Sequence, residues 1–130
     1  MADYSAKRIS DMEAIYRGGF RKARAELGVT AFGIQVLELP PGLTQLPQHD
    51  HTHDGQEEVY LLLDGAAEMQ IEGETLALDR ETMVRVPADT RRKIVTGESP
   101  ARILVIGATP GSADEVNQYT ELGQPDPMAA

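Results

Sequence analysis

The sequence contains no cysteine, so disulfides, zinc sites built on thiolates and cysteine nucleophiles are excluded. Positive charge is also scarce. The 12 Lys and Arg against 21 Asp and Glu give a formal net charge of −9, which repels phosphate backbones and anionic lipid surfaces. No apolar run reaches the roughly 18 residues that cross a bilayer, and residues 1–21 lack the apolar centre of a signal peptide. We therefore expect a cytoplasmic protein that binds neither nucleic acid nor membranes.

The chain is long enough for a single domain, residues 1–130, with a core of its own. We expect three parts: an N-terminal helical segment over 1–28, a region of strands over 30–107 and a C-terminal extension over 108–130. In the extension, Ser112–Glu115 predicts one capped helical turn, and residues 123–130, which include two prolines, predict a loose tail.

Two short helices are expected near the N-terminus. Ser10 and Glu13 match the capping box, in which the two side chains satisfy each other's free backbone amides, so a helix should begin there. The pair Gly18-Gly19 interrupts it. Residues 20–27 again have a helical composition, until Gly28 provides a left-handed stop.

From Thr30 onward the apolar period changes to two, which is typical of strands. Turn residues separate the alternating stretches at regular intervals, and this pattern predicts a sandwich or barrel. About eight strands are expected, the number in a jelly roll. They cover residues 32–39, 49–53, 59–63, 67–71, 76–78, 83–86, 92–96 and 102–106.

All three histidines lie at alternate positions, His49, His51 and His53. Side chains two apart on an extended strand point to one face, so a strand here would direct three imidazoles toward one metal ion. Glu58 follows shortly, at the start of a buried strand over 59–63 that ends at the turn Asp64-Gly65. The alternative is a polar loop that happens to be rich in histidine. His49 is the weaker candidate for a ligand.

These residues resemble the first motif of the cupin superfamily, G(x)5HxH(x)3-4E(x)6G. His51, His53, Glu58 and Gly65 stand at the motif's spacing, whereas Gln45 stands where its first glycine would be. The resemblance implies an all-β cupin jelly-roll barrel over residues 30–107. It also implies a divalent metal ion held by His51, His53 and Glu58, and the sequence does not distinguish iron, manganese, nickel and zinc.

The second cupin motif, G(x)5PxG(x)2H(x)3N, is degenerate. With its proline aligned on Pro87, its histidine ligand falls on Arg92. A guanidinium is permanently cationic and has no lone pair, so Arg92 cannot ligate a metal.

Three consequences of Arg92 stay open. The first is a metal held by two histidines and one carboxylate, a set that suits Fe(II) or Mn(II). The second is that His49 takes the vacant place. The third is a site that holds metal weakly or not at all, with Arg92 paired to Glu58. If Arg92 faces the cavity unpaired, it is suited to bind a carboxylate or phosphate, so we expect a small anionic ligand.

Tyr60 shares strand parity with Glu58, so both should point inward, where Tyr60 either donates a hydrogen bond to a ligand or packs as a core tyrosine. Val59, Leu61 and Leu63 occupy the other face and are apolar as well, so that face should also be covered. Because cupins are commonly dimers, the resemblance favours a homodimer.

Two classes of function stay open. One is a metal-dependent enzyme acting on a small organic acid or sugar-like molecule, such as an oxygenase, isomerase or decarboxylase. The other is a pocket without catalysis that binds a ligand or stores a metal. The only nearby candidates for proton transfer are Glu57, Tyr60 and Arg92, so whether the protein is an enzyme is not decided by the sequence.

Overall fold

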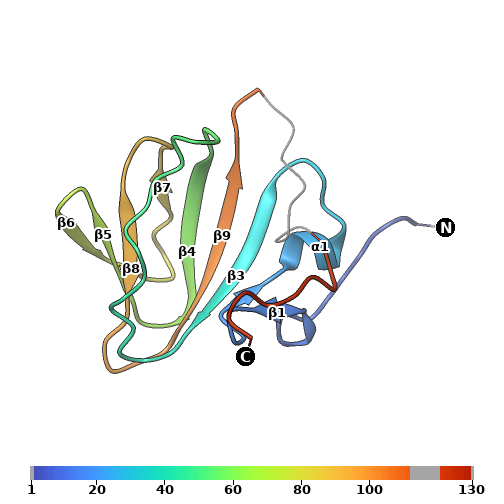
Figure 1. Ribbon diagram of the computed structural model, residues 1–130, viewed down its shortest axis with the longest axis horizontal. Helices are drawn as coiled ribbons and strands as arrows, with labels where there is room; N and C mark the ends of the chain where they lie inside the picture. The colour runs from blue at the N-terminus through green and yellow to red at the C-terminus, as the bar shows by residue number, and fades with distance from the viewer. Residues whose placement is uncertain (1, 112–120, 130) are drawn as a thin grey trace.

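A computed structural model describes residues 2–111 and 121–129. Two antiparallel sheets pack face to face as a jelly-roll barrel that does not close into a continuous ring (Figure 1). The larger sheet has the order β1-β2-β3-β9-β4-β7, and the smaller has the order β6-β5-β8. The strands are β1 (Ala14–Ile15), β2 (Phe20–Arg21), β3 (Gly33–Leu39), β4 (Glu57–Gly65), β5 (Glu68–Ile71), β6 (Glu74–Ala77), β7 (Val84–Val86), β8 (Arg92–Val95) and β9 (Ala101–Ala108). The predicted all-β fold is confirmed.

The core lies between the inner faces of the two sheets. Strand β4 shows the alternation clearly, because Glu58, Tyr60 and Leu62 are buried while the residues between them are half-buried. The expected parity of this strand is therefore confirmed. The core cluster consists of Leu39, Tyr60, Leu62, Ala67, Met69, Leu78, Val84, Val86, Ile94, Ala101, Ile103 and Val105.

The turn after β4 requires glycine. Gly65 has φ +80°, and a Cβ added there would lie 1.9 Å from the carbonyl oxygen of Pro100. Any other residue would force the β4 end away from the segment that leads into β9. The glycine that ends the first motif therefore allows the end of β4 to approach the start of β9 closely.

The prediction of a helix that begins at Ser10 is wrong. Ile9–Asp11 form a single turn of 3-10 helix, and β1 and β2 follow as a hairpin against β3. Glu13 does not close a capping box. Its carboxylate instead accepts hydrogen bonds from Lys22 Nζ at 3.0 Å and from the Gly123 amide at 2.9 Å. Contacts with distant residues have overridden the local signal.

The second expected helix exists but is shorter than predicted. Helix α1 spans Ala23–Leu27, while Phe20 and Arg21 belong to β2. Gly28 ends the helix with φ 78° and donates its amide to the carbonyl of Arg24. The predicted left-handed stop is confirmed. No helix in the described ranges 2–111 and 121–129 is long and apolar enough to cross a membrane.

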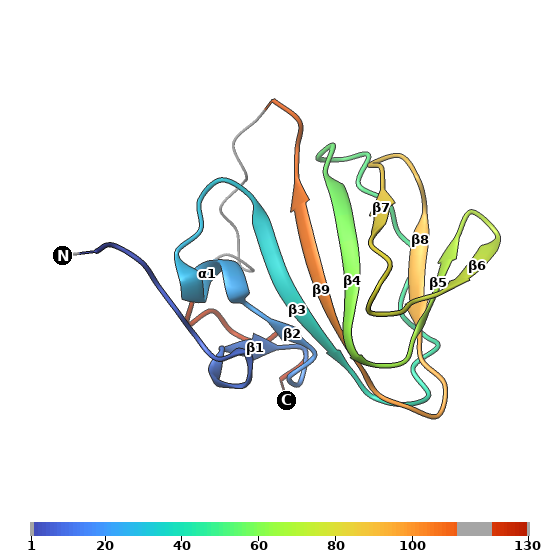
Figure 2. The ribbon, with the colours of Figure 1, turned by 180° about the vertical axis from the view of Figure 1, so that it is seen from behind.

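The C-terminal segment lies beside the N-terminal hairpin (Figure 2). Asp126 accepts hydrogen bonds from the amides of Tyr16, at 2.8 Å, and Arg17, at 3.0 Å. Lys22 Nζ reaches the carbonyl of Glu121 at 2.8 Å. Residues 123–129 form neither helix nor strand and are mostly exposed, as expected of a tail, but Gly123 and Asp126 anchor them to the N-terminal hairpin. The helical turn expected at Ser112–Glu115 lies outside the described residues.

Candidate metal and ligand site

The histidine stretch is not a strand. His49 forms an isolated antiparallel bridge with Arg92, through amide–carbonyl bonds of 3.0 and 2.8 Å. The chain turns directly after His51, whose carbonyl accepts the amides of Asp54 and Gly55. Gly55 has φ +72°, which a turn of this kind requires. The alternation that was expected to direct three imidazoles to one face stops at this turn.

The structure brings His49 and His51 together with Glu58. One ligand atom from each residue lies within 4.8 Å of the other two, and His51 Nε2 is 3.3 Å from Glu58 Oε1. His53 belongs to a separate group with His51 and Asp54, and its side chain is 72% exposed, against 17% for His51. The third member of the cluster with His51 and Glu58 is thus His49, where His53 was expected.

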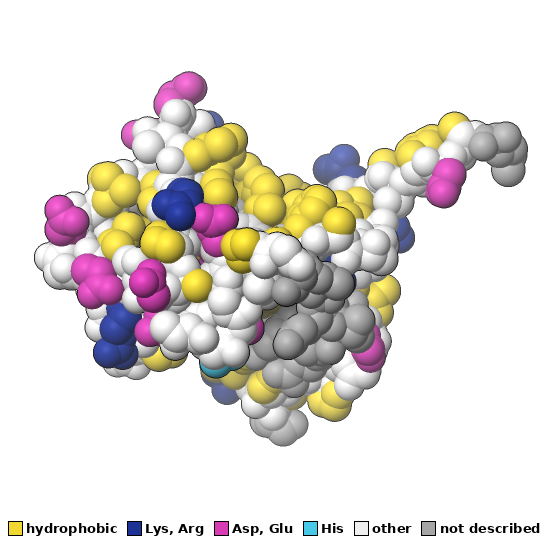
Figure 3. All heavy atoms as spheres, turned by 90° about the horizontal axis from the view of Figure 1, so that it is seen from above, with side chains coloured by type: hydrophobic (Ala, Val, Ile, Leu, Met, Phe, Trp, Pro, Cys, Tyr) yellow, Lys and Arg dark blue, Asp and Glu magenta, His cyan; other side chains and the backbone are white. Residues whose placement is uncertain are grey.

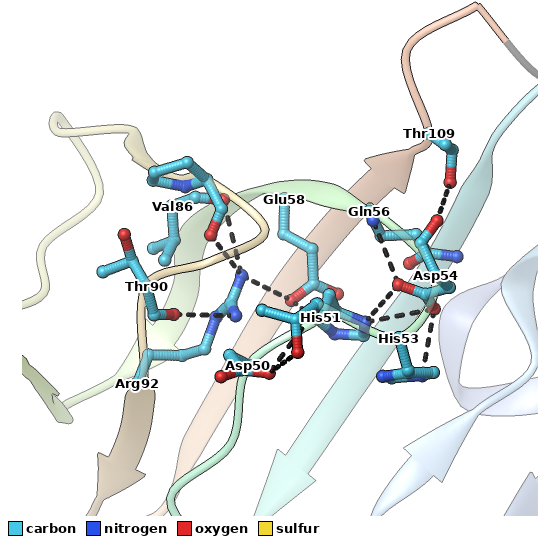
Figure 4. Close-up of polar contacts among 12 residues, drawn as sticks. Asp50, His51, His53, Asp54, Gln56, Glu58, Val86, Thr90, Arg92 and Thr109 are labelled. Atoms are coloured by element: carbon cyan, nitrogen blue, oxygen red, sulfur yellow. Dashed lines mark hydrogen bonds and ion pairs between the residues drawn. The ribbon is translucent and has the colours of Figure 1, made fainter.

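Glu58 is the buried centre of the site, 5% exposed, and several donors meet at its Oε1. Tyr60 donates its hydroxyl at 2.6 Å, and Arg92 Nη2 lies 3.5 Å away (Figure 4). Burial raises the pKa of Glu58, but hydrogen bonds from His51 and Tyr60 outweigh it and hold that pKa below its ordinary value. Glu58 is therefore a carboxylate at neutral pH.

The neighbours of Glu58 have shifted pKa values as well. The hydrogen bond to Glu58 raises the pKa of His51. His49 is exposed on one side, and desolvation of its inner side followed by the charge of Arg92 lowers its pKa. Burial and the Glu58 charge raise the pKa of Tyr60 far above its usual range. The Tyr60 hydroxyl stays protonated and is committed to Glu58.

Arg92 begins β8 and is fully buried, at 0% exposure. Its guanidinium donates to backbone carbonyls: Nη1 to Thr90 at 3.0 Å, and Nη2 to Val86 and Pro87 at 3.4 and 3.5 Å (Figure 4). Within the described part of the chain its Nε finds no acceptor. Arg92, the residue that aligns with the motif's histidine, is thus paired with Glu58 and with backbone carbonyls.

Asp54 is a site residue that the sequence reasoning missed. Its carboxylate oxygens lie 3.2 and 3.3 Å from His51 Nδ1, which leaves Nε2 of the same ring directed at Glu58 (Figure 4). The amide of Gln56 also binds Asp54, at 3.0 Å. The available signal was an acidic residue three positions after a histidine and directly before Gly55, which predicts a turn that folds the carboxylate back onto the ring.

A cavity of about 920 Å³ adjoins the cluster. Its polar end contains His49, His51, Glu58 and Arg92, and apolar side chains form much of the remaining wall. This size and this mixture of an apolar wall with a few convergent polar groups are typical of small-molecule sites.

Residues 35–107, more than half of the chain, match the family model described as the cupin domain. The chain belongs to the cupin family. The predicted membership is confirmed, and the cupin's His49, His51, Glu58 and Arg92 all fall within the matched region. A search of curated proteins found no match.

Solved structures show the same fold over different lengths. A cupin protein from Bacteroides fragilis is 23% identical, with a TM-score of 0.68, and the match covers 95% of this chain and 99% of that one. A putative sugar phosphate isomerase from Acidithiobacillus ferrooxidans is 21% identical, with a TM-score of 0.63, over 84% of this chain and 76% of that one. The DMSP lyase DddQ from Ruegeria pomeroyi is 28% identical, with a TM-score of 0.55, over 70% of this chain and 45% of that one. These likenesses concern the fold, and the roles of individual residues rest on the geometry above.

Proposed function

We propose that this cupin holds a divalent metal ion between His49, His51 and Glu58 and binds a small organic ligand in the adjoining cavity. The observation that carries the proposal is the convergence of one ligand atom from each of these residues within 4.8 Å. Two imidazoles and a carboxylate are a donor set that suits Fe(II) or Mn(II) and leaves coordination positions open. The residues present therefore fit the metal that the family implies.

Asp54 supports His51 as a ligand. A histidine that binds a metal through one ring nitrogen commonly donates the other N–H to a carboxylate, which fixes the tautomer and the ring orientation. His51 has this arrangement, because Asp54 lies at Nδ1 and the shared centre lies on the Nε2 side. We place the metal at Nε2 of His51.

When bound, the metal would act as a Lewis acid toward an oxygen of the ligand. The chain's own residues would bind and orient that ligand. The three proton-transfer candidates named from the sequence are all engaged: Glu57 pairs with Arg85, Tyr60 with Glu58, and Arg92 with Glu58 and carbonyls. This arrangement favours binding over acid–base catalysis by those three residues, and an anionic ligand held directly by Arg92 stays a prediction.

A second candidate function is a metal-free binding pocket. The observation in its favour is the saturation of Glu58 Oε1 by His51, Tyr60 and Arg92, since a carboxylate that is already satisfied gains less from a cation. In that case Arg92 replaces the ion as the positive partner of Glu58.

Metal analysis of the purified protein separates the two candidates. After incubation with Mn(II) and desalting, we expect close to one metal per chain in the wild type and a large loss in His49→Ala and in Glu58→Gln. His53→Ala is the matched control, because it removes an exposed imidazole two residues from His51 and should keep its metal. Absence of metal from the folded wild type would reject the metal site, and equal loss in His53→Ala and His49→Ala would reject the assignment of His49.

We also propose that the partner of this chain is a second copy of itself. The outer face of the larger sheet carries paired apolar residues across β3, β9 and β4, and they are half-buried. They are Ile34, Val59, Leu61, Leu104 and Ile106. Figure 3 shows hydrophobic side chains gathered between the barrel and the N-terminal arm. Light scattering should give the mass of a dimer for the wild type and of a monomer for Leu104→Lys, whereas a monomeric wild type would reject the proposal.

A further inference from the structure

The lining of the cavity beside the histidine cluster has two unlike parts. One part holds the only buried carboxylate that faces it in the described ranges, Glu58, together with His49 and His51. The aliphatic part of the lining combines three strands with the segment that precedes the histidines. It is formed by Leu37, Leu39, Leu43, Leu46, Ile94 and Val105.

The aliphatic wall is held in place before any ligand arrives. Thr96 donates its amide to the carbonyl of Leu43 at 2.9 Å. Its hydroxyl accepts the Leu43 amide at 2.9 Å and donates to the carbonyl of Pro40 at 2.6 Å. Gly42 donates to the carbonyl of Gly97 at 2.7 Å. These bonds fasten the segment before the histidines to the end of β8. A wall fixed in this way costs little ordering when a ligand binds.

Several wall residues are not fully used by the core. Leu37, Leu43 and Leu46 are only partly buried, although they pack against the core cluster. Their remaining apolar surface faces a cavity of about 920 Å³, where a ligand with an apolar body would remove it from water. A small polar ligand would leave that surface wet.

The charges at the other end select the head group. The carboxylate of Glu58 and the guanidinium of Arg92 lie 3.5 Å apart and offset each other, and Asp54 adds one negative charge beside His51. A divalent ion at His49 and His51 would therefore still leave that end positive. An anionic head group is favoured at such an end.

We propose that the ligand is an amphipathic carboxylate, with its carboxylate at the His49–His51–Glu58 end and an aliphatic body of several carbons along the leucine wall. The inference rests on the proposed metal site for the head group, and on the wall alone for the body. It specifies the ligand by chemistry: a monocarboxylic acid with a hydrocarbon chain, as opposed to a dicarboxylate or a sugar.

Calorimetry with straight-chain carboxylates tests both halves of the proposal. Acetate, butyrate, hexanoate and octanoate are titrated into Mn(II)-loaded protein and into metal-stripped protein. Affinity should rise about fourfold per added methylene, the fold-change that corresponds to roughly 0.8 kcal/mol for each buried CH₂. Metal-stripped protein should bind each acid more weakly, while octanol should bind alike to both forms.

A variant of the wall separates the body from the head. Leu46→Asn should flatten the dependence on chain length and leave manganese content unchanged. Leu76→Asn is the matched control, because Leu76 is 39% exposed on β6 and outside the cavity, so it should keep the full dependence. Melting curves confirm that both variants are folded.

The outcomes distinguish this proposal from the proposed function. Metal-loaded protein that binds acetate as tightly as octanoate, or binds octanoate no better than metal-stripped protein does, overturns the amphipathic carboxylate while the metal site stands. Protein that takes up no metal fails the proposed function on the metal measurement itself. Calorimetry on that same protein still decides the body, since a steep length dependence supports the leucine wall and a flat one overturns it.

Discussion

Among the described residues of this cupin, one lysine and one arginine are fully buried: Lys22 and Arg92, each at 0% exposure. The surroundings of these two cations differ. Lys22 Nζ has short contacts, 3.0 Å to Glu13 and 2.8 Å to the carbonyl of Glu121. Three of the four Arg92 contacts lie at 3.4–3.5 Å, and its Nε finds no acceptor among the described residues.

This difference in contact geometry separates a buried cation that stabilises the fold from one that contributes less to stability. Buried polar groups normally find partners with good geometry, so an unsatisfied one needs an explanation. Lys22 joins the N-terminal hairpin to the C-terminal segment through two short contacts. Arg92 lines the cavity beside the histidine cluster, and its looser contacts are what a site under functional constraint would show.

The largest expected effect comes from breaking the Lys22 pair. Glu13→Ala leaves Lys22 Nζ with only the carbonyl of Glu121 and removes the acceptor of the Gly123 amide. The free energy of unfolding should fall by about 3 kcal/mol, because the Lys22 ammonium is fully buried and loses its charged partner, although the Glu13 side chain is itself 34% exposed. Urea denaturation measures it, with the exposed Glu74→Ala as control. The double variant Glu13→Ala, Lys22→Met should recover part of the loss, and a loss below about 1 kcal/mol in the single variant would contradict the comparison.

Arg92→His should destabilise the protein less than Glu13→Ala does, and it should increase the affinity for metal. The loss should be about 1–2 kcal/mol, because the long Arg92 contacts contribute less than those of Lys22 and Glu58 keeps its bonds from Tyr60 and His51. The new imidazole can serve as a further ligand, so affinity for Mn(II) should rise on the order of tenfold, the effect that a single supporting group has at a metal site.

The matched control for Arg92→His is Arg91→His, an exposed neighbour that should change neither stability nor metal affinity. Metal titration and melting curves on the three proteins decide the matter. Unchanged metal affinity together with a loss of 3 kcal/mol or more would make Arg92 a structural cation like Lys22.

The smallest expected effect is a pH dependence at Glu13. The hydrogen bond from the Gly123 amide and the one from Lys22 hold the pKa of Glu13 below its ordinary value. A carboxyl with a lowered pKa stabilises the folded state above its unfolded pKa, near 4.3 for Glu, and that stabilisation is lost as the pH falls through the folded pKa. Melting temperatures between about pH 6 and pH 3 should therefore fall less in Glu13→Ala than in the wild type. Parallel curves would show that Glu13 contributes nothing to acid sensitivity.

Short-range patterns predicted the barrel strands well. The alternation through β4 placed Glu58 and Tyr60 inside, and Gly65 was expected at the turn that its φ of +80° requires. Such features depend on neighbours in the sequence, since strand parity and turn chemistry are local.

The features that were missed depend on distant partners or on one turn. Glu13 is drawn from its expected capping role by Lys22 and Gly123, which no window around Ser10 reveals. The turn closed at Gly55 ends the alternation of the histidines and exposes His53. The contact of Asp54 with His51 depends on that turn, for which the pair Asp54-Gly55 was the local signal.

The hairpin turn at Tyr16 and Arg17 has a consequence for the order of folding. Both residues have positive φ, 54° and 57°, a strained region for side chains other than glycine, and their amides are bound by Asp126. The carboxylate that stabilises this strained turn belongs to Asp126, which lies 110 residues after Tyr16 in the chain. During synthesis the barrel strands leave the ribosome before Asp126 does. We therefore expect the N-terminal hairpin, although it is synthesised first, to be among the last elements to reach its native conformation.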